Sequence, residues 1–152
     1  TESTSIKIPA PKILPPDSCP QRSATEQGIL LPLLKRLDVR ISPLEGEELT
    51  AKKAKVSGWI KLIDEDAPCS LATMLFADAF PPSIFGLLGN IGWVPTLELT
   101  VQIRREPSPG WVQGEFSTLD LNDGRMIEDG LLWDKNGNLI AQSRQISLLL
   151  SR

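Results

Sequence analysis

Histidine is absent from this chain of 152 residues. Its absence excludes His-based general acid–base catalysis, Ser-His-Asp and Cys-His nucleophiles, and the common zinc sites with His ligands. The two cysteines, Cys19 and Cys69, form no Cys-x-x-Cys pair, and we expect two free thiols in a reducing compartment. Any catalysis must therefore use carboxylates, amides, hydroxyls or bound water.

An excess of positive charge is also lacking, because 16 Lys and Arg face 19 Asp and Glu, for a net charge of -3. This balance argues against nucleic acid or anionic lipid as a partner. No apolar run approaches the roughly 18 residues of a membrane span, and no secretory signal pattern is present. Glycine-rich phosphate loops and metal-ligand spacings are missing too. We therefore expect no membrane partner, no metal, no resident cofactor and a cytoplasmic location.

The composition of the whole chain, 41% hydrophobic and 23% charged, is ordinary for one globular domain with a hydrophobic core. Residues 1–26 are rich in Pro, Ser, Thr and Lys without apolar periodicity, and they predict an extended linker or leader. We place the folded domain at residues 27–152. Because the chain starts with Thr1 instead of Met, we expect a processed, trimmed or excised chain.

The hydrophobic pattern predicts two strands, one helix and then four strands. Strands are expected at 37–42 and 53–62, the second with lysines on its solvent face. The helix is expected within 64–80, where Leu71, Met74, Leu75 and Ala79 recur at helical spacing before two prolines end it. Four further strands lie within 93–106, 110–121, 125–134 and 139–150, and Asn-Gly in 134–138 predicts a hairpin. This order indicates an α+β domain.

The last strand, with sequence IAQSRQISLLL, carries an amide, Gln145, among apolar residues. Taken alone, Gln145 has ordinary explanations as a buried hydrogen-bonding residue or an edge residue. In the strand at 93–106, alternation places Leu97, Leu99, Val101 and Ile103 on one face, and Thr96 shares the other face with Glu98. Asp78, near the expected helix end, is by itself most simply a solvated residue or a cap.

Three stretches together resemble the second half of a type II acyl-CoA thioesterase and its double hotdog relatives. They are LFADAFPPSIF, GWVPTLELTVQIRREPSPGWVQGEF and EDGLLWDKNGNLIAQSRQ, and the resemblance covers about residues 34–150. It implies a hotdog fold, in which one long helix is wrapped by a curved antiparallel sheet. It also implies a catalytic trio that holds the hydrolytic water. The matching positions in this chain are Asp78, Thr96 and Gln145.

The function implied by this resemblance is hydrolysis of an acyl thioester, in which CoA or phosphopantetheine is present only as part of the substrate. Glu98 is a polar neighbour of the trio. The alternative is a catalytically inactive hotdog that binds an acyl ligand or serves as a structural subunit. Hydratase or dehydratase activity is disfavoured because hotdogs of those classes generally rely on histidine.

The resemblance covers only one of the two fused hotdogs of the family, so the first half is missing from this chain. A lone hotdog exposes a sheet edge and a helix flank. We therefore expect a second hotdog as partner, either the N-terminal half as a separate chain or another copy in a homo-oligomer.

Overall fold

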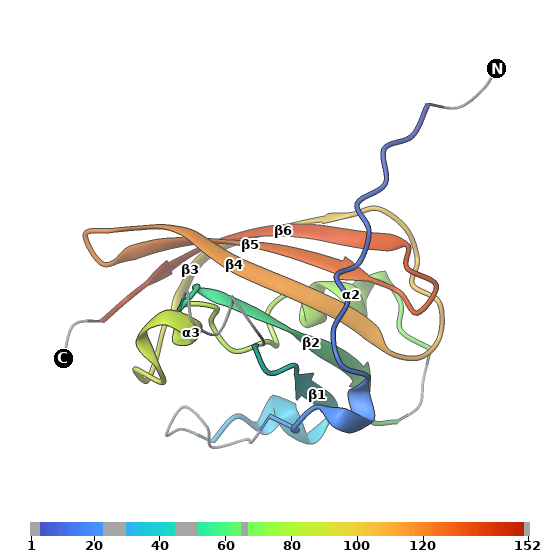
Figure 1. Cartoon of the computed structure of the whole chain (residues 1–152), viewed down its shortest axis with the longest axis horizontal. Helices are drawn as coiled ribbons and strands as arrows, with labels where there is room; N and C mark the ends of the chain where they lie inside the picture. Colours follow the sequence, from blue (N-terminus) through green and yellow to red (C-terminus); the bar gives the residue numbers. More distant parts are fainter. Residues whose placement is uncertain (1–3, 23–29, 45–51, 65–66, 151–152) are drawn as a thin grey trace.

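An antiparallel sheet of six strands, in the order β1-β2-β4-β5-β6-β3, forms the body of the domain (Figure 1). A computed structural model of the chain describes residues 4–22, 30–44, 52–64 and 67–150. The strands are β1 (Leu37–Ile41), β2 (Lys55–Leu62), β3 (Thr96–Ile103), β4 (Val112–Asn122), β5 (Arg125–Trp133) and β6 (Leu139–Leu148). The helical elements are η1 (Pro16–Ser18), η2 (Pro32–Lys35), α2 (Ser70–Phe76) and α3 (Phe85–Leu88). The predicted order of two strands, a helix and four strands is confirmed.

Two tight turns set the register of the long strands β4, β5 and β6. Asn122 pairs with Arg125 across a two-residue loop, Asp123-Gly124, whose φ angles of 48° and 71° suit a type I′ hairpin turn. The Asn-Gly turn predicted at 134–138 joins β5 to β6. Asp134 Oδ1 accepts bonds there from the backbone N–H groups of Asn136 and Asn138, at 3.0 and 2.9 Å.

Helix α2 is shorter than expected and presents a different face to the core. It spans seven residues and ends at Phe76, so Asp78 lies in the turn that follows. Thr73 and Phe76 are buried, whereas Leu71 is 76% and Met74 48% exposed. Leu71 and Met74, which recur at helical spacing, therefore lie outside the covered face of α2. This short helix is apolar around most of its circumference, so periodicity alone could not identify the covered face.

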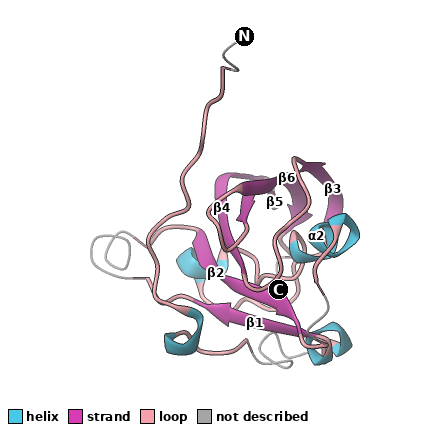
Figure 2. Cartoon of the chain, turned by 90° about the vertical axis from the view of Figure 1, so that its right-hand side faces the viewer, coloured by secondary structure: helices cyan, strands magenta, loops and turns pink. Residues whose placement is uncertain are grey.

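The core lies between α2 and the concave side of the curved sheet (Figure 2). The Phe80 and Phe116 rings pack at a centroid distance of 4.9 Å, and Phe76 is completely buried beside them. Aliphatic residues of β1, β2, β4, β5 and β6 complete this cluster, including Val39, Ile60, Val112, Leu132 and Ile140. At one edge, β3 pairs only with β6, and Leu97 there is 58% exposed.

The N-terminal segment, which composition assigns to a linker, lies against the outer face of the sheet (Figure 1). We call residues 8–14 the strap. Its carbonyls accept hydrogen bonds from side chains of three adjacent strands: Ile8 from Trp133 Nε1 at 2.8 Å, Pro11 from Gln113 Nε2 at 2.6 Å and Leu14 from Trp59 Nε1 at 2.8 Å. Residues 20–22 then run beside β1. The predicted domain boundary near residue 26 stays a prediction.

Cys19 is buried and Cys69 exposed, and both are free thiols, as predicted. Across the ranges that the structure describes, no helix combines the length and apolarity needed to cross a membrane.

Candidate active site

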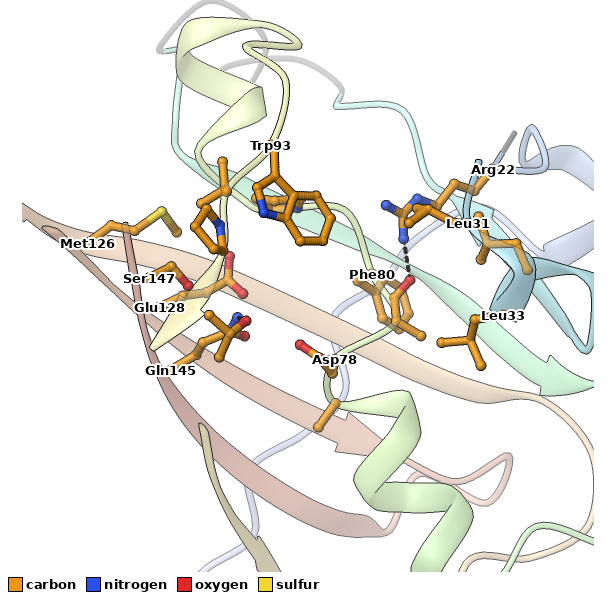
Figure 3. A pocket seen from close by; sticks show the side chains of 17 residues that line it. Arg22, Leu31, Leu33, Asp78, Phe80, Trp93, Met126, Glu128, Gln145 and Ser147 are labelled. Atoms are coloured by element: carbon orange, nitrogen blue, oxygen red, sulfur yellow. Dashed lines mark hydrogen bonds between the residues drawn. The ribbon is translucent and has the colours of Figure 1, made fainter. Parts of the chain in front are cut away.

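One pocket contains all three residues of the predicted trio (Figure 3). The cavity measures about 390 Å³ and lies where the turn after α2, the start of β3 and the inner faces of β5 and β6 meet. Its polar lining comes from Arg22, Asp78, Thr96, Glu128, Gln145 and Ser147. Sequence positions far apart, 78, 96 and 145, thus converge on one space.

Thr96 and Gln145 are in direct contact, because Gln145 Nε2 donates a hydrogen bond to Thr96 Oγ1. Thr96 lies opposite Ser147 on β6, whereas Glu98 lies opposite the adjacent residue, Ile146. Leu97 is therefore the extra residue of a β-bulge. The bulge places Thr96 on the pocket face and Glu98 on the opposite face, so the prediction that these two residues share a face is wrong.

Asp78 follows α2 in a turn, and its carboxyl group points into the pocket (Figure 3). The residue remains exposed because the pocket is open to solvent, but the neighbouring protein removes part of the water around the carboxyl group. This desolvation raises the pKa of Asp78, and the positive charge of Arg22 partly opposes the rise. Arg22 Nη1 donates to the Ala79 carbonyl at 2.5 Å, which connects the N-terminal segment to the turn that carries Asp78.

Glu128 is a pocket residue that the sequence reasoning missed. It is 7% exposed, and its side chain lies on the inner face of β5, directly across from Gln145 of β6. A signal was present, since Met126, Glu128, Gly130 and Leu132 alternate along β5 as its buried set. A buried carboxyl group within the apolar face of a strand is unusual and indicates a functional role.

The remaining pocket wall is largely apolar. Leu31, Leu33, Phe80, Trp93 and Met126 surround the polar group, and Trp93 is 51% exposed. An apolar cavity with a few convergent polar groups is typical of a small-molecule site. In the described part of the chain, no group of three or more Cys, Asp or Glu residues is arranged to hold a metal ion.

The sequence matches the acyl-CoA thioesterase C-terminal domain over residues 16–149. The chain belongs to this family. The match begins within the segment that composition assigns to a linker, and it covers the trio and the whole sheet.

Solved structures share the fold of this chain. A proposed thioesterase II from Thermobifida fusca is 30% identical, with a TM-score of 0.77, over 98% of this chain and 57% of that chain. The acyl-CoA thioesterase II TesB2 of Mycobacterium marinum is 21% identical, with a TM-score of 0.67, over 100% and 59%. A hotdog protein of unknown function from Alicyclobacillus acidocaldarius, 18% identical, has a TM-score of 0.82 over 100% and 58%. The predicted α+β hotdog fold is confirmed.

Curated relatives are uncharacterized proteins of Mycobacterium bovis and Mycobacterium tuberculosis. They are 29% identical over 83 residues, which is 55% of this chain and 28% of theirs. The chain thus corresponds to less than two thirds of the length of these relatives and of the solved structures described above.

Proposed function

We propose that this acyl-CoA thioesterase domain hydrolyses acyl thioesters, with Asp78, Thr96 and Gln145 orienting the attacking water. The observation that carries the proposal is their convergence in one pocket, where the amide of Gln145 already donates to the hydroxyl of Thr96. Because a thioester is already activated, its hydrolysis needs a positioned water, a base and hydrogen-bond donors to the developing oxyanion. A carboxylate, a hydroxyl and an amide can position the water, accept its proton and supply donors.

In the proposed reaction, the water oxygen attacks the thioester carbonyl carbon while the Asp78 carboxylate accepts a water proton. The tetrahedral intermediate then collapses to the carboxylic acid, and the carbon–sulfur bond breaks. The sulfur leaves with the electron pair of that bond and takes up the proton that Asp78 had accepted, which releases the thiol and restores the Asp78 carboxylate. A carboxylate whose pKa is raised is a stronger base while it remains ionised near neutral pH, so the partial desolvation of Asp78 favours this role.

The Thr96–Gln145 hydrogen bond suits the pair to hold a water. Because the Thr96 oxygen accepts from Gln145, its own proton is available to another acceptor. Gln145 retains a second N–H donor and its amide oxygen as an acceptor. Together the two side chains offer donors and an acceptor to one water molecule, or a donor to the thioester carbonyl oxygen.

The apolar pocket wall gives the acyl chain a place to bind. Phe80, Trp93 and Met126 line the cavity beside the polar trio, so an acyl group bound there brings its carbonyl carbon close to the water. We propose no resident cofactor, since CoA or phosphopantetheine enters only as the thiol portion of the substrate.

The deciding experiment measures thiol release from a panel of acyl-CoAs by the wild type, by Asp78→Asn and by a control, Asp129→Asn. Asp129 also carries a carboxyl group, but it pairs with Arg144 on the other face of the sheet. We expect Asp78→Asn to lose at least about a hundredfold in rate, and Asp129→Asn to keep the wild-type rate.

Equal rates for the wild type and Asp78→Asn would remove Asp78 from the mechanism. If the wild type binds acyl-CoA without releasing any thiol, the domain is instead an inactive hotdog that binds an acyl ligand.

We also propose that a second hotdog unit covers the β3 edge and the adjoining flank of α2. Strand β3 has a free edge in the described sheet, and Leu71, Met74 and Leu97 are exposed near that side of the domain. Exposed edges and apolar patches of this kind are typically covered by a partner. The partner is a second copy of the chain or a preceding hotdog of a longer protein, in keeping with the greater length of the solved relatives.

A further inference from the structure

Glu128 occupies a position in the pocket that the proposed trio leaves unexplained. It lies in a row of inward-facing polar side chains that crosses three strands, between Thr118 of β4 and Gln145 of β6. Figure 3 shows its side chain beside Gln145, on the side of the cavity toward which the Asp78 carboxyl points. Glu128 is therefore a second carboxyl group in the same cavity, and the most buried group of its charged lining.

The surroundings of Glu128 fix its carboxyl group in place. The backbone N–H of Ser83 donates to Glu128 Oε2 at 2.7 Å, and Ser83 Oγ lies 2.8 Å from Thr118 Oγ1. Ser83 is fully buried. A neutral carboxylic acid can accept the Ser83 bond through its carbonyl oxygen and still present its own O–H to the cavity.

Two other charged groups face this cavity. Asp78 approaches from the turn after α2, and Arg22 approaches from the N-terminal segment, where it donates to the Ala79 carbonyl. Two charged residues of neighbouring strands, Glu98 of β3 and Asp129 of β5, lie on the opposite face of the sheet and do not face the cavity. The negative charge of Asp78 is therefore the main charge that acts on Glu128.

Burial raises the pKa of Glu128, and the negative charge of Asp78 raises it further, whereas the hydrogen bonds from Ser83 lower it. Two carboxyl groups in one cavity hold a shared proton over a range of pH, because ionising both would place like charges together. Burial favours the proton on the more buried group, Glu128, and leaves the charge on the more exposed Asp78, close to Arg22.

We propose that Glu128 is a positioning residue of the hydrolytic site, which as a neutral acid beside Gln145 confines the single negative charge of the pocket to Asp78. This inference rests on the proposed thioesterase function. When Glu128 ionises at higher pH, a second negative charge enters the pocket and opposes the oxyanion that develops during attack. Hydrolysis therefore declines on the alkaline side as Glu128 loses its proton, and on the acid side as Asp78 gains one.

The test compares kcat/KM across about pH 5 to 9 for the full-length wild type, Glu128→Gln and Asp129→Asn. The amide of Glu128→Gln keeps the shape and the neutral state. We expect it to stay within about threefold of the wild type at the optimum and to lose the alkaline decline, whereas Asp129→Asn follows the wild-type curve. An unchanged alkaline decline in Glu128→Gln overturns the proposal. A loss of about a hundredfold or more at every pH also overturns it, since Glu128 would then act as the base.

A second measurement needs neither activity nor the variant. Side-chain carboxyl carbons of the full-length wild type are followed by NMR as the pH is raised. We expect the Glu128 carboxyl to titrate at higher pH than the other glutamates and after Asp78. A Glu128 that titrates with the exposed glutamates refutes the inference even if the protein hydrolyses thioesters. If no thioester is hydrolysed but Glu128 titrates late, the proposed function fails and the proton assignment stands.

Discussion

The strap offers the clearest test of the tertiary structure, because three side-chain donors on adjacent strands bind carbonyls of a segment more than 40 positions away in each case. Gln113 is the most suitable of the three for substitution. It is 6% exposed, and its Nε2 donates to the Pro11 carbonyl at 2.6 Å. Gln113→Met keeps the length and approximate volume of the side chain but removes the donor.

The expected change in the free energy of unfolding follows from the one hydrogen bond between Gln113 and Pro11. Its loss leaves the Pro11 carbonyl without the Gln113 donor, so Gln113→Met should lower the free energy of unfolding by about 0.5–1.5 kcal/mol. In a chain that lacks residues 1–14 the carbonyl is gone and position 113 faces water. There the same substitution should change stability by less than about 0.5 kcal/mol. The coupling between substitution and truncation is therefore expected at about 1 kcal/mol.

The coupling is measured by urea unfolding, followed by tryptophan fluorescence. The four proteins compared are the wild type, Gln113→Met, the chain that lacks residues 1–14, and the chain that carries both changes. Trp111→Phe is a useful control in both chain lengths, because Trp111 stacks under Lys61 at 4.9 Å and has no bond to the strap. Its effect should be the same with and without residues 1–14. A coupling near zero for Gln113→Met would refute the docking of the strap and return this segment to the predicted role of a free linker.

Two further predictions concern the core and the partner surface. A Cβ at Gly130 would meet the Ser143 hydroxyl and stand 2.5 and 2.6 Å from Phe116 ring atoms. Gly130→Ala should therefore lower the free energy of unfolding in urea by about 1–3 kcal/mol. This loss is expected even though replacing a strand glycine usually stabilises a protein. Adding Phe116→Leu should recover part of that loss, and a Gly130→Ala protein as stable as the wild type contradicts the packing described here. If a second hotdog covers the α2 flank, Leu71→Glu combined with Met74→Glu should shift the mass measured by light scattering toward that of one chain. An unchanged mass places the partner elsewhere, and the exposed Leu119→Glu on the β4 strand serves as the control.

The sequence by itself determined the order of the elements and most of their boundaries. Alternating apolar residues predicted the long strands, Pro81 and Pro82 marked the end of the helical region, and Asn-Gly predicted the hairpin between β5 and β6. These features depend on local backbone preferences, which act between neighbours in the chain. The three residues of the trio were identified because three short stretches resemble type II acyl-CoA thioesterases. No local sequence pattern connects Asp78, Thr96 and Gln145.

Only the tertiary structure decided which side of each strand faces the pocket and which distant residues come together there. A strict two-residue period places Thr96 beside Glu98, but the bulge at Leu97 turns Thr96 into the pocket, and a bulge becomes visible only from the register with β6. Glu128 becomes a candidate because Asp78, Ser83 and Gln145 surround it from three other elements. The strap binds through its backbone carbonyls, which every residue possesses, so composition could not distinguish it from a free linker.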